Sequence, residues 1–207
     1  MSLKKAMIYI VEDDLSFRKS LERLIKALGY EFLSFDSANS FLAHGSMRRP
    51  ACLLLDVHLP GIDGMDLQQE LIARGINLPV IFMTGHGSIP MSVQAMKNGA
   101  EDFLPKPFET ADLKRAILKA LERDGNSRKQ EIEVQKCAAL IDTLTPREKE
   151  VLTWVITGKL NKQIAAALGT SEKTIKAHRA CVMHKTGMSS VADLVRLVEK
   201  VNISPAR

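Results

Sequence analysis

The sequence predicts an α/β fold, with a doubly wound sheet of five parallel strands followed by a second, all-α domain of four helices. Short apolar runs and amphipathic helical segments alternate through residues 6–123, as they do when crossover helices connect parallel strands. The remaining residues show helical periodicity without strand-like runs. A chain of 207 residues is long enough for two such domains.

The strand that the sequence defines best lies at residues 52–56. Three leucines run directly into Asp56, and the turn residues Pro60 and Gly61 follow. A continuous apolar run bounded by turn residues is typical of a strand buried on both faces. Similar runs predict the full set of strands at residues 7–11, 30–35, 52–56, 78–83 and 102–104.

The segments between these strands have helical spacing. In residues 16–28 the apolar side chains at positions 17, 21, 24, 25 and 28 share one helical face, and Gly29 ends the helix. These elements make residues 1–123 the first predicted domain. The other helices are predicted at residues 37–43, 65–73, 89–97 and 109–123.

A break is predicted after this domain, because Arg123 is followed by four turn-forming residues that end at Ser127. Residues 124–141 are predicted to be a linker, mostly helical and polar, with one thin apolar stripe. The sequence leaves open whether this linker continues the preceding helix or forms a separate one.

Residues 142–207 are predicted to contain four helices. Thr145 and Glu148 have the spacing of a capping box at the start of the first helix. Ser171 is the predicted cap of the third helix, and Ser190 or a neighbour is expected to start the fourth. The second and third helices are joined by a tight, glycine-containing turn, which predicts a helix-turn-helix.

Charge is distributed unevenly along the chain. The formal net charge is +5, but residues 1–123 hold 15 Lys+Arg and 15 Asp+Glu, so the whole excess lies in residues 124–207. Only the second part is therefore expected to meet a polyanion. No stretch reaches the ~20 apolar residues of a membrane helix, no export signal is recognisable, and the three cysteines lack metal-ligand spacing. We expect a cytoplasmic protein with reduced thiols and no membrane partner.

Polar residues follow four of the predicted strands, at the edge where parallel strands place their carboxyl ends. Clustered carboxylates beside an ammonium predict a Mg²⁺ site, because Mg²⁺ prefers oxygen ligands, and a carboxylate able to accept a phosphoryl group. Taken singly, the acidic run could cap the next helix and the lysine could be a solvated loop charge. The residues expected to meet at this edge are Glu12, Asp13, Asp14, Asp56, Thr84 and Lys106.

The third helix of the second domain has two different faces. Ile175, His178 and Val182 recur at helical spacing and are expected to face the core. A basic helix with small residues at its centre can lie in the major groove of DNA. The alternative interpretation is that these charges only face solvent. The opposite face is predicted to carry Lys173, Lys176, Ala177, Ala180 and His184, with Arg179 and Lys185 flanking it.

These residues resemble two known families of domain. The first domain is similar to a response-regulator receiver domain of flavodoxin-like fold, and the run from Leu144 to Lys185 resembles the LuxR-type helix-turn-helix. Together the two resemblances cover nearly the whole chain, which is similar to two-component response regulators of the NarL/FixJ family. The residues that carry the receiver resemblance are Glu12, Asp13, Asp56, Thr84, Lys106 and Pro107.

The resemblance implies that Asp56 is the phosphoacceptor and that Mg²⁺ is the cofactor. Asp13 and Asp56 are implied to hold the metal, with Glu12 close by, at a position where aspartate is more usual. His58 is grouped with the metal-site residues and could partly cover the phosphorylated carboxyl group. For His58, as for the other histidines of the first domain, an exposed loop imidazole is the alternative.

The resemblance also implies a set of switch residues. Thr84 and Lys106 are expected to contact the phosphoryl oxygens, and Phe103 is expected to swing inward on activation. A cis peptide is implied between Lys106 and Pro107, since proline is the residue that tolerates one.

In the second domain, the resemblance implies that Lys176, Ala177 and Ala180 face the edges of DNA bases. The two alanines can offer only apolar contacts, for instance to a thymine methyl group. Phosphate contacts position a protein on DNA without specifying sequence. The residues implied to make them are Lys162, Lys173, Arg179 and His184.

The expected function is that of a DNA-binding transcriptional response regulator, not an enzyme. A sensor histidine kinase is expected to phosphorylate Asp56, which promotes homodimerisation and controls binding to double-stranded promoter DNA; RNA polymerase is a further candidate partner.

Two alternatives stay open. An aspartyl-phosphate enzyme would need a substrate cavity that the sequence does not reveal. An RNA-binding or purely protein-binding output is the other, and the aromatic content of 5% argues against base stacking.

Overall fold

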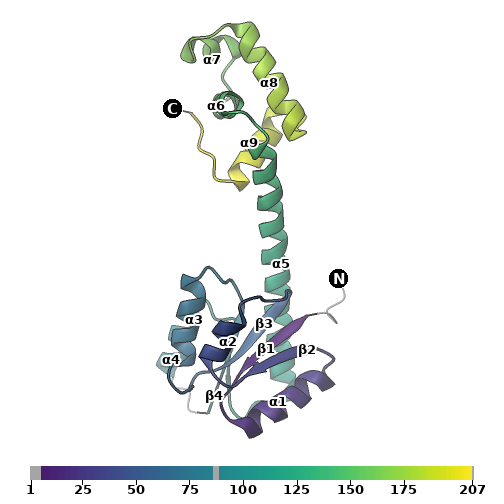
Figure 1. Cartoon of the computed structure of the whole chain (residues 1–207), viewed down its shortest axis with the longest axis vertical. Coiled ribbons are helices and arrows are strands. Elements are labelled where there is room, and N and C mark those ends of the chain that lie inside the picture. Colours follow the sequence, from purple (N-terminus) through teal and green to yellow (C-terminus); the bar gives the residue numbers. More distant parts are fainter. Residues whose placement is uncertain (1–5, 86–88, 207) are drawn as a thin grey trace. The chain divides into compact units, whose positions relative to one another are not determined.

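The computed structural model describes residues 6–85 and 89–206. The chain divides into two compact units, residues 1–128 and residues 129–207 (Figure 1). Within the described parts of the chain, no helix is both long and apolar enough to cross a membrane.

The first unit is built on a five-stranded parallel sheet, which confirms the predicted fold class. The strand order is β2-β1-β3-β4-β5, so β1 lies between β2 and β3 and each connection crosses over a face of the sheet. Every strand begins within two residues of its predicted start. The strands are β1 Met7–Val11, β2 Glu31–Phe35, β3 Ala51–Asp56, β4 Val80–Thr84 and β5 Asp102–Pro105.

Five helices cover the two faces of this sheet. Helices α2, α3 and α4 pack on one face, and helices α1 and α5 pack on the other (Figure 1). The helices are α1 Leu15–Ala27, α2 Ala38–His44, α3 Gly64–Ala73, α4 Ile89–Lys97 and α5 Thr110–Asp142.

Side chains of the central strand β3 alternate between two cores. Leu53 and Leu55 pack with α2, α3 and α4, whereas Cys52 and Leu54 pack with α1 and α5. All four are fully buried, because helices cover both faces of a parallel sheet. The strand then ends in Asp56, so the most apolar strand carries a carboxylate to the edge of the sheet.

Helix α5 answers a question that the sequence left open. The turn-forming residues after Arg123 do not interrupt the helix, which runs through Gly125 to Asp142. The linker is helical, as predicted, and it continues the preceding helix. The side chains of Asp124 and Ser127 are hydrogen-bonded to Arg49, Ala51 and Asn77 of the same unit.

The second unit packs four helices and the end of α5 around one core. The predicted caps are confirmed: Thr145 and Glu148 form a capping box, and the hydroxyls of Ser171 and Ser190 each accept a backbone N–H. Ile141 of α5 is buried in the same core. The helices are α6 Pro146–Val155, α7 Asn161–Ala167, α8 Glu172–Thr186 and α9 Val191–Lys200.

Gly64 begins α3 directly against the backbone of Asp56. A Cβ atom at Gly64 would lie 2.2 Å from the Asp56 carbonyl oxygen. Because backbone cannot move aside as a flexible side chain does, Gly64→Ala is expected to lower the free energy of unfolding of the first unit by about 1–3 kcal/mol. Urea titration with alkylation of Cys52, which is fully buried in β3, measures the unfolding of this unit alone.

Gly125→Ala is the matched control for this substitution. A Cβ atom there has no neighbour within 4 Å, and alanine is a better helix former than glycine by about 0.5–1 kcal/mol. We therefore expect this variant to be slightly stabilised. An unchanged Cys52 labelling midpoint in Gly64→Ala would show that the close approach to Asp56 is not needed.

Candidate functional site

Four strands deliver polar side chains to the carboxyl edge of the sheet. Glu12 follows β1, Asp56 ends β3, Thr84 ends β4, and Lys106 follows β5. The backbone N–H of Lys106 donates to the carbonyl of Thr84 at 2.6 Å, which extends the pairing of β4 and β5 to the lysine. Parallel pairing therefore brings together residues that lie up to 94 positions apart in the sequence.

The Lys106 ammonium joins two of the carboxylates. Its Nζ lies 2.7 Å from Oε2 of Glu12 and 3.0 Å from Oδ2 of Asp56. The same ammonium stands 4.2 Å from the ring centroid of Phe17 in α1, a distance at which the ring face attracts a cation. The Phe17 ring in turn meets that of Phe108 edge to face. The aromatic pair therefore supports the lysine from the side of α1.

Three carboxylates could hold a metal ion. One oxygen from each of Glu12, Asp13 and Asp56 lies within 4.8 Å of the others. Glu12 and Asp56 are 1% and 6% exposed, whereas Asp13 faces solvent. An all-oxygen set that is open on one side fits Mg²⁺, which keeps several waters when bound.

His58 is exposed, and its imidazole is not part of this carboxylate group among the described residues. Its backbone N–H points to the site and lies 3.4 Å from Oδ1 of Asp56. The histidine side chain borders the site without converging on the acids. Another histidine of the first domain, His86, for which the alternative was an exposed loop imidazole, lies outside the described residues.

Burial raises the pKa of Glu12 to about 7, and the nearby Asp56 carboxylate adds to this effect. The hydrogen bond from Lys106 acts in the opposite direction but does not cancel it. Burial therefore makes the charged form of Glu12 costly even with the Lys106 ammonium beside it.

Thr84 and Phe103, two of the three expected switch residues, occupy different environments. Thr84 is completely buried. Phe103 is partly buried against the core beneath α4, with its ring centroid 6.3 Å from that of Phe82. The cis peptide implied between Lys106 and Pro107 is present.

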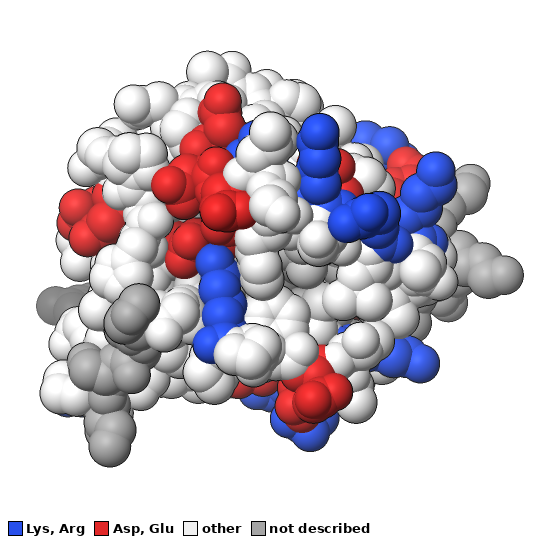
Figure 2. All heavy atoms as spheres, turned by 90° about the horizontal axis from the view of Figure 1, so that it is seen from below, with Lys and Arg blue, Asp and Glu red and all other residues white. Residues whose placement is uncertain are grey.

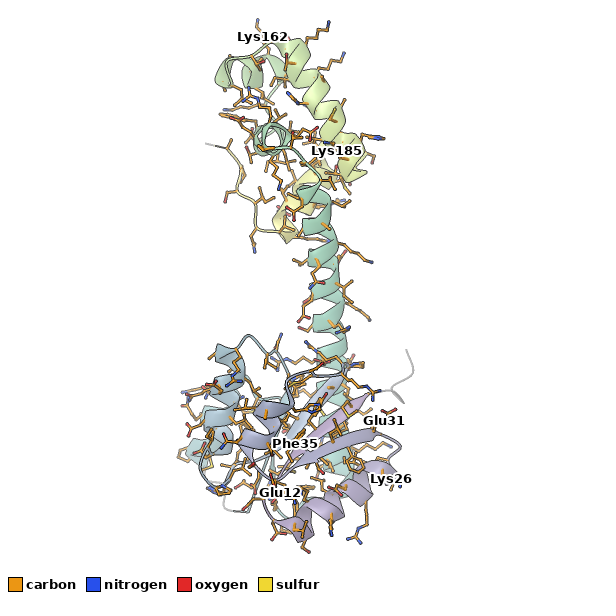
Figure 3. All side chains as sticks on the ribbon, viewed as in Figure 1. Glu12, Lys26, Glu31, Phe35, Lys162 and Lys185 are labelled. Atoms are coloured by element: carbon orange, nitrogen blue, oxygen red, sulfur yellow. The ribbon has the colours of Figure 1, made fainter. Side chains whose placement is uncertain are left out.

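The carboxylates and the Lys106 ammonium border a shallow depression of about 330 Å³. Figure 2 shows acidic side chains gathered at the carboxyl edge of the sheet, with a basic side chain beside them. Glu12 is labelled at the same edge in Figure 3. The space is large enough for a phosphoryl group with water. The depression is lined by Glu12, Asp13, Asp14, Phe17, Asp56, His58, Gly85 and Lys106.

Two residues of the site were not assigned roles from the sequence. The Phe17 ring faces the Lys106 ammonium, although its spacing indicated only an apolar helix face. The guanidinium of Arg18 donates to the backbone carbonyls of Glu12 and Asp13. Arg18 lies four residues after Asp14, whose carboxylate caps α1. This closeness in the sequence was the signal that could have placed its guanidinium near Glu12 and Asp13.

The second candidate site is the exposed face of α8. Ile175 and Val182 are buried and His178 is half-buried, in agreement with the face predicted to pack on the core. The opposite face is open to solvent, and Lys162 on α7 is exposed as well (Figure 3). The exposed α8 residues are Lys173, Lys176, Ala177, Ala180 and His184.

The two flanking basic residues hold helices together. Nζ of Lys185 lies 2.7 Å from Oε2 of Glu148, the same carboxylate that caps α6 through the N–H of Thr145. Arg179 is half-buried and donates to Oδ1 of Asn161 at the start of α7, at 3.3 Å. These contacts fix α8 against α6 and α7, so the exposed face is presented on a supported helix.

Family comparisons divide the chain in the same way. Residues 8–118 match the response regulator receiver domain family. Residues 142–198 match the LuxR family of bacterial regulatory proteins. Both matches agree with the families that the sequence motifs resemble.

Similar proteins extend along nearly the whole chain. Nodulation protein W of Bradyrhizobium diazoefficiens is 46% identical over 200 residues, which is 97% of this chain and 88% of that protein. The transcriptional regulatory protein FixJ of Azorhizobium caulinodans is 39% identical over 96% of this chain and 94% of its own. The solved structure of response regulator StyR matches with a TM-score of 0.82 and 43% identity, covering 95% of this chain and 99% of that one.

The raised pKa of Glu12 predicts a dependence of stability on pH. Because this pKa is about 7 in the folded chain against 4.5 for the free side chain, the folded state binds more protons between these values. The free energy of unfolding of the first unit is therefore expected to fall as pH rises through this window in metal-free buffer, by at most about 1.4 kcal/mol per pH unit. Circular dichroism in urea at several pH values measures this slope.

Glu12→Gln is the control, because it keeps the shape of the side chain and removes its titration. The slope between about pH 4.5 and 7 is expected to flatten in this variant, while the fluorescence of Trp154 follows the other unit. Equal slopes in wild type and Glu12→Gln would show that Glu12 does not titrate in this window.

Proposed function

The chain belongs to the two-component transcriptional response regulators that join a receiver domain to a LuxR-type DNA-binding domain, and from this premise we propose that phosphorylation of Asp56 controls its binding to promoter DNA. The observation that carries this proposal is the placement of Lys106, whose ammonium lies 3.0 Å from Asp56 beside an open depression. A carboxylate held between an ammonium and open space can accept a phosphoryl group and have its new charge offset.

In the proposed step, a carboxylate oxygen of Asp56 attacks the phosphorus of a phosphohistidine or a small acyl phosphate. A P–O bond to Asp56 forms while the P–N bond of the histidine, or the P–O bond of the acyl group, breaks. The bonding electrons leave with the donor. Lys106 would contact the transferred phosphoryl oxygens, and the Thr84 hydroxyl would turn toward them.

Glu12, Asp13 and Asp56 are the side chains that would hold Mg²⁺, since their oxygens already converge. When bound, the ion supplies positive charge to the phosphoryl oxygens during transfer. His58, at the rim of the depression, would shield the phosphorylated carboxyl group and affect its lifetime.

The proposed switch passes from the site to a dimer surface. Movement of Thr84 and Phe103 would change the face formed by α4 and β5. Val93 and Met96 of α4 are each 46% exposed, and an apolar face of this kind supports a homodimer in the phosphorylated state. By linkage, DNA with two half-sites must favour the same dimer.

The proposed DNA contacts come from α7 and α8. Lys176, Ala177 and Ala180 would face the bases, because they lie on the exposed face of a supported helix. A sensor histidine kinase is the proposed phosphodonor, RNA polymerase a further proposed partner, and the cytoplasm the proposed location. The residues proposed to meet phosphates are Lys162, Lys173, Arg179 and His184.

Asp56→Asn tests the phosphorylation step. Wild-type protein incubated with acetyl phosphate and Mg²⁺ is expected to gain one phosphoryl adduct by intact mass, and the variant is expected to gain none, because an amide oxygen does not form the acyl phosphate. Light scattering on the same samples measures dimerisation. A variant that still dimerised and bound DNA in response to acetyl phosphate would overturn the proposed switch.

Lysine substitutions test the division between base and phosphate contacts. Lys162→Ala is expected to weaken binding to all duplexes and to lower the salt slope of the binding constant by about 0.9. Lys176→Ala is expected to cost about 1–3 kcal/mol on sequences selected from a random duplex library and much less on unselected DNA. Fluorescence anisotropy at several salt concentrations measures both.

Lys26→Ala is the control for these variants, because it removes the same charge from an exposed position in α1. It is expected to leave both affinity and salt slope unchanged. Equal losses on selected and unselected DNA for Lys176→Ala would show that Lys176 contacts phosphates and not bases.

A further inference from the structure

Helix α5 contains a stretch that should not be helical by its own sequence. Gly125, Asn126 and Ser127 have low helix propensity, and residues 128–136 are exposed on every side. A helical stretch whose residues are all exposed buries little apolar surface, and such a stretch is marginal in water. Something outside the local sequence must therefore keep this part of α5 helical.

The carboxylate of Asp124 makes the strongest contacts of α5 near Gly125. Asp124 is 0% exposed. Its Oδ2 accepts from the backbone N–H of Ala51 at 2.9 Å and from Nε of Arg49 at 3.2 Å, and its Oδ1 pairs with the second guanidinium nitrogen of Arg49. The carboxylate is therefore bonded both to an arginine and to the first residue of β3.

A second, weaker contact lies one helical turn further on. The side-chain amide of Asn77, in the loop between α3 and β4, donates to the hydroxyl of Ser127 at 3.1 Å. Further along the helix, Glu133 pairs with Lys200 of α9 at 2.6 Å. The contacts of Asp124 and Ser127 thus lie on the two sides of Gly125, just before the exposed stretch.

We propose that Asp124 is a buried anchor that fastens α5 to the first unit and keeps the helix wound across Gly125 and the residues after it. When the carboxylate is absent, the helix is expected to open around residues 125–131 while the sheet remains folded. The anchor acts at the amino end of β3, at the opposite end of this strand from Asp56, and it is independent of the phosphorylation proposed above.

Hydrogen–deuterium exchange on the full chain tests this proposal. In an α-helix the amides of residues 126–131 bond to the carbonyls of residues 122–127, so opening of this stretch raises their exchange rate. Asp124→Ala is expected to raise it by about tenfold or more, the amount that loss of a charge-assisted hydrogen bond produces. Adding Gly125→Ala to this variant is expected to recover about fivefold.

Alkylation of Cys52 reports separately on the sheet. Burial raises the pKa of this thiol and Asp124 adds to the effect, so Cys52 reacts only when the sheet opens. Fast exchange at residues 126–131 with Cys52 still protected would support the anchor. Unchanged exchange with Cys52 protected would overturn it.

Asp124→Asn decides the question if the alanine variant exposes Cys52. The amide keeps the size of the side chain and an oxygen that can accept from Ala51, but it loses the charge that binds Arg49. Exchange at residues 126–131 is expected to rise in this variant with Cys52 protected. Wild-type exchange rates in Asp124→Asn would show that the ion pair does not hold the helix.

Discussion

The Lys106 ammonium is what allows two carboxylates to be buried side by side at the carboxyl edge of the sheet. Glu12 and Asp56 are 1% and 6% exposed, and both accept a hydrogen bond from Nζ of Lys106. Burial still raises the pKa of Glu12, so its charged form remains costly beside that ammonium. A divalent cation on the oxygens of Glu12, Asp13 and Asp56 would favour the charged form.

Much of this edge could be predicted from the sequence, because the rules that create it are local or topological. Apolar runs define the strands, and parallel pairing brings Glu12, Asp56 and Lys106 to one edge although they are far apart in the chain. The contact between Lys106 and the Phe17 ring could not be predicted in this way, since it depends on how α1 is rotated over the sheet. The bonds from Arg18 to backbone carbonyls depend on the same rotation.

In the second unit, helical periodicity separates the buried face of α8 from the exposed one, but it cannot distinguish among basic residues. Lys185 is drawn to Glu148 and Arg179 to Asn161, so each holds two helices together. Lys176 differs because its side chain faces solvent. Charge counts treat these residues alike, whereas their tertiary partners decide which of them can meet DNA without first giving up a contact that supports the fold.

Strand β3 runs between two buried carboxylates that differ in their surroundings. The N–H of its first residue, Ala51, donates to Asp124, which is fully buried and paired with Arg49. Its last residue, Asp56, shares its ammonium partner with Glu12 and lies beside an open depression. A buried ion pair whose carboxylate is fully hydrogen-bonded is costly to break. An ammonium that is shared by two carboxylates beside open space has room for a new anion. The local sequence was enough to identify Asp56 at the carboxyl end of β3, because the apolar run and the turn that follows it mark the end of the strand. It left open whether the helix continues past Arg123, because the partners of Asp124 lie 75 and 73 residues away in the sequence.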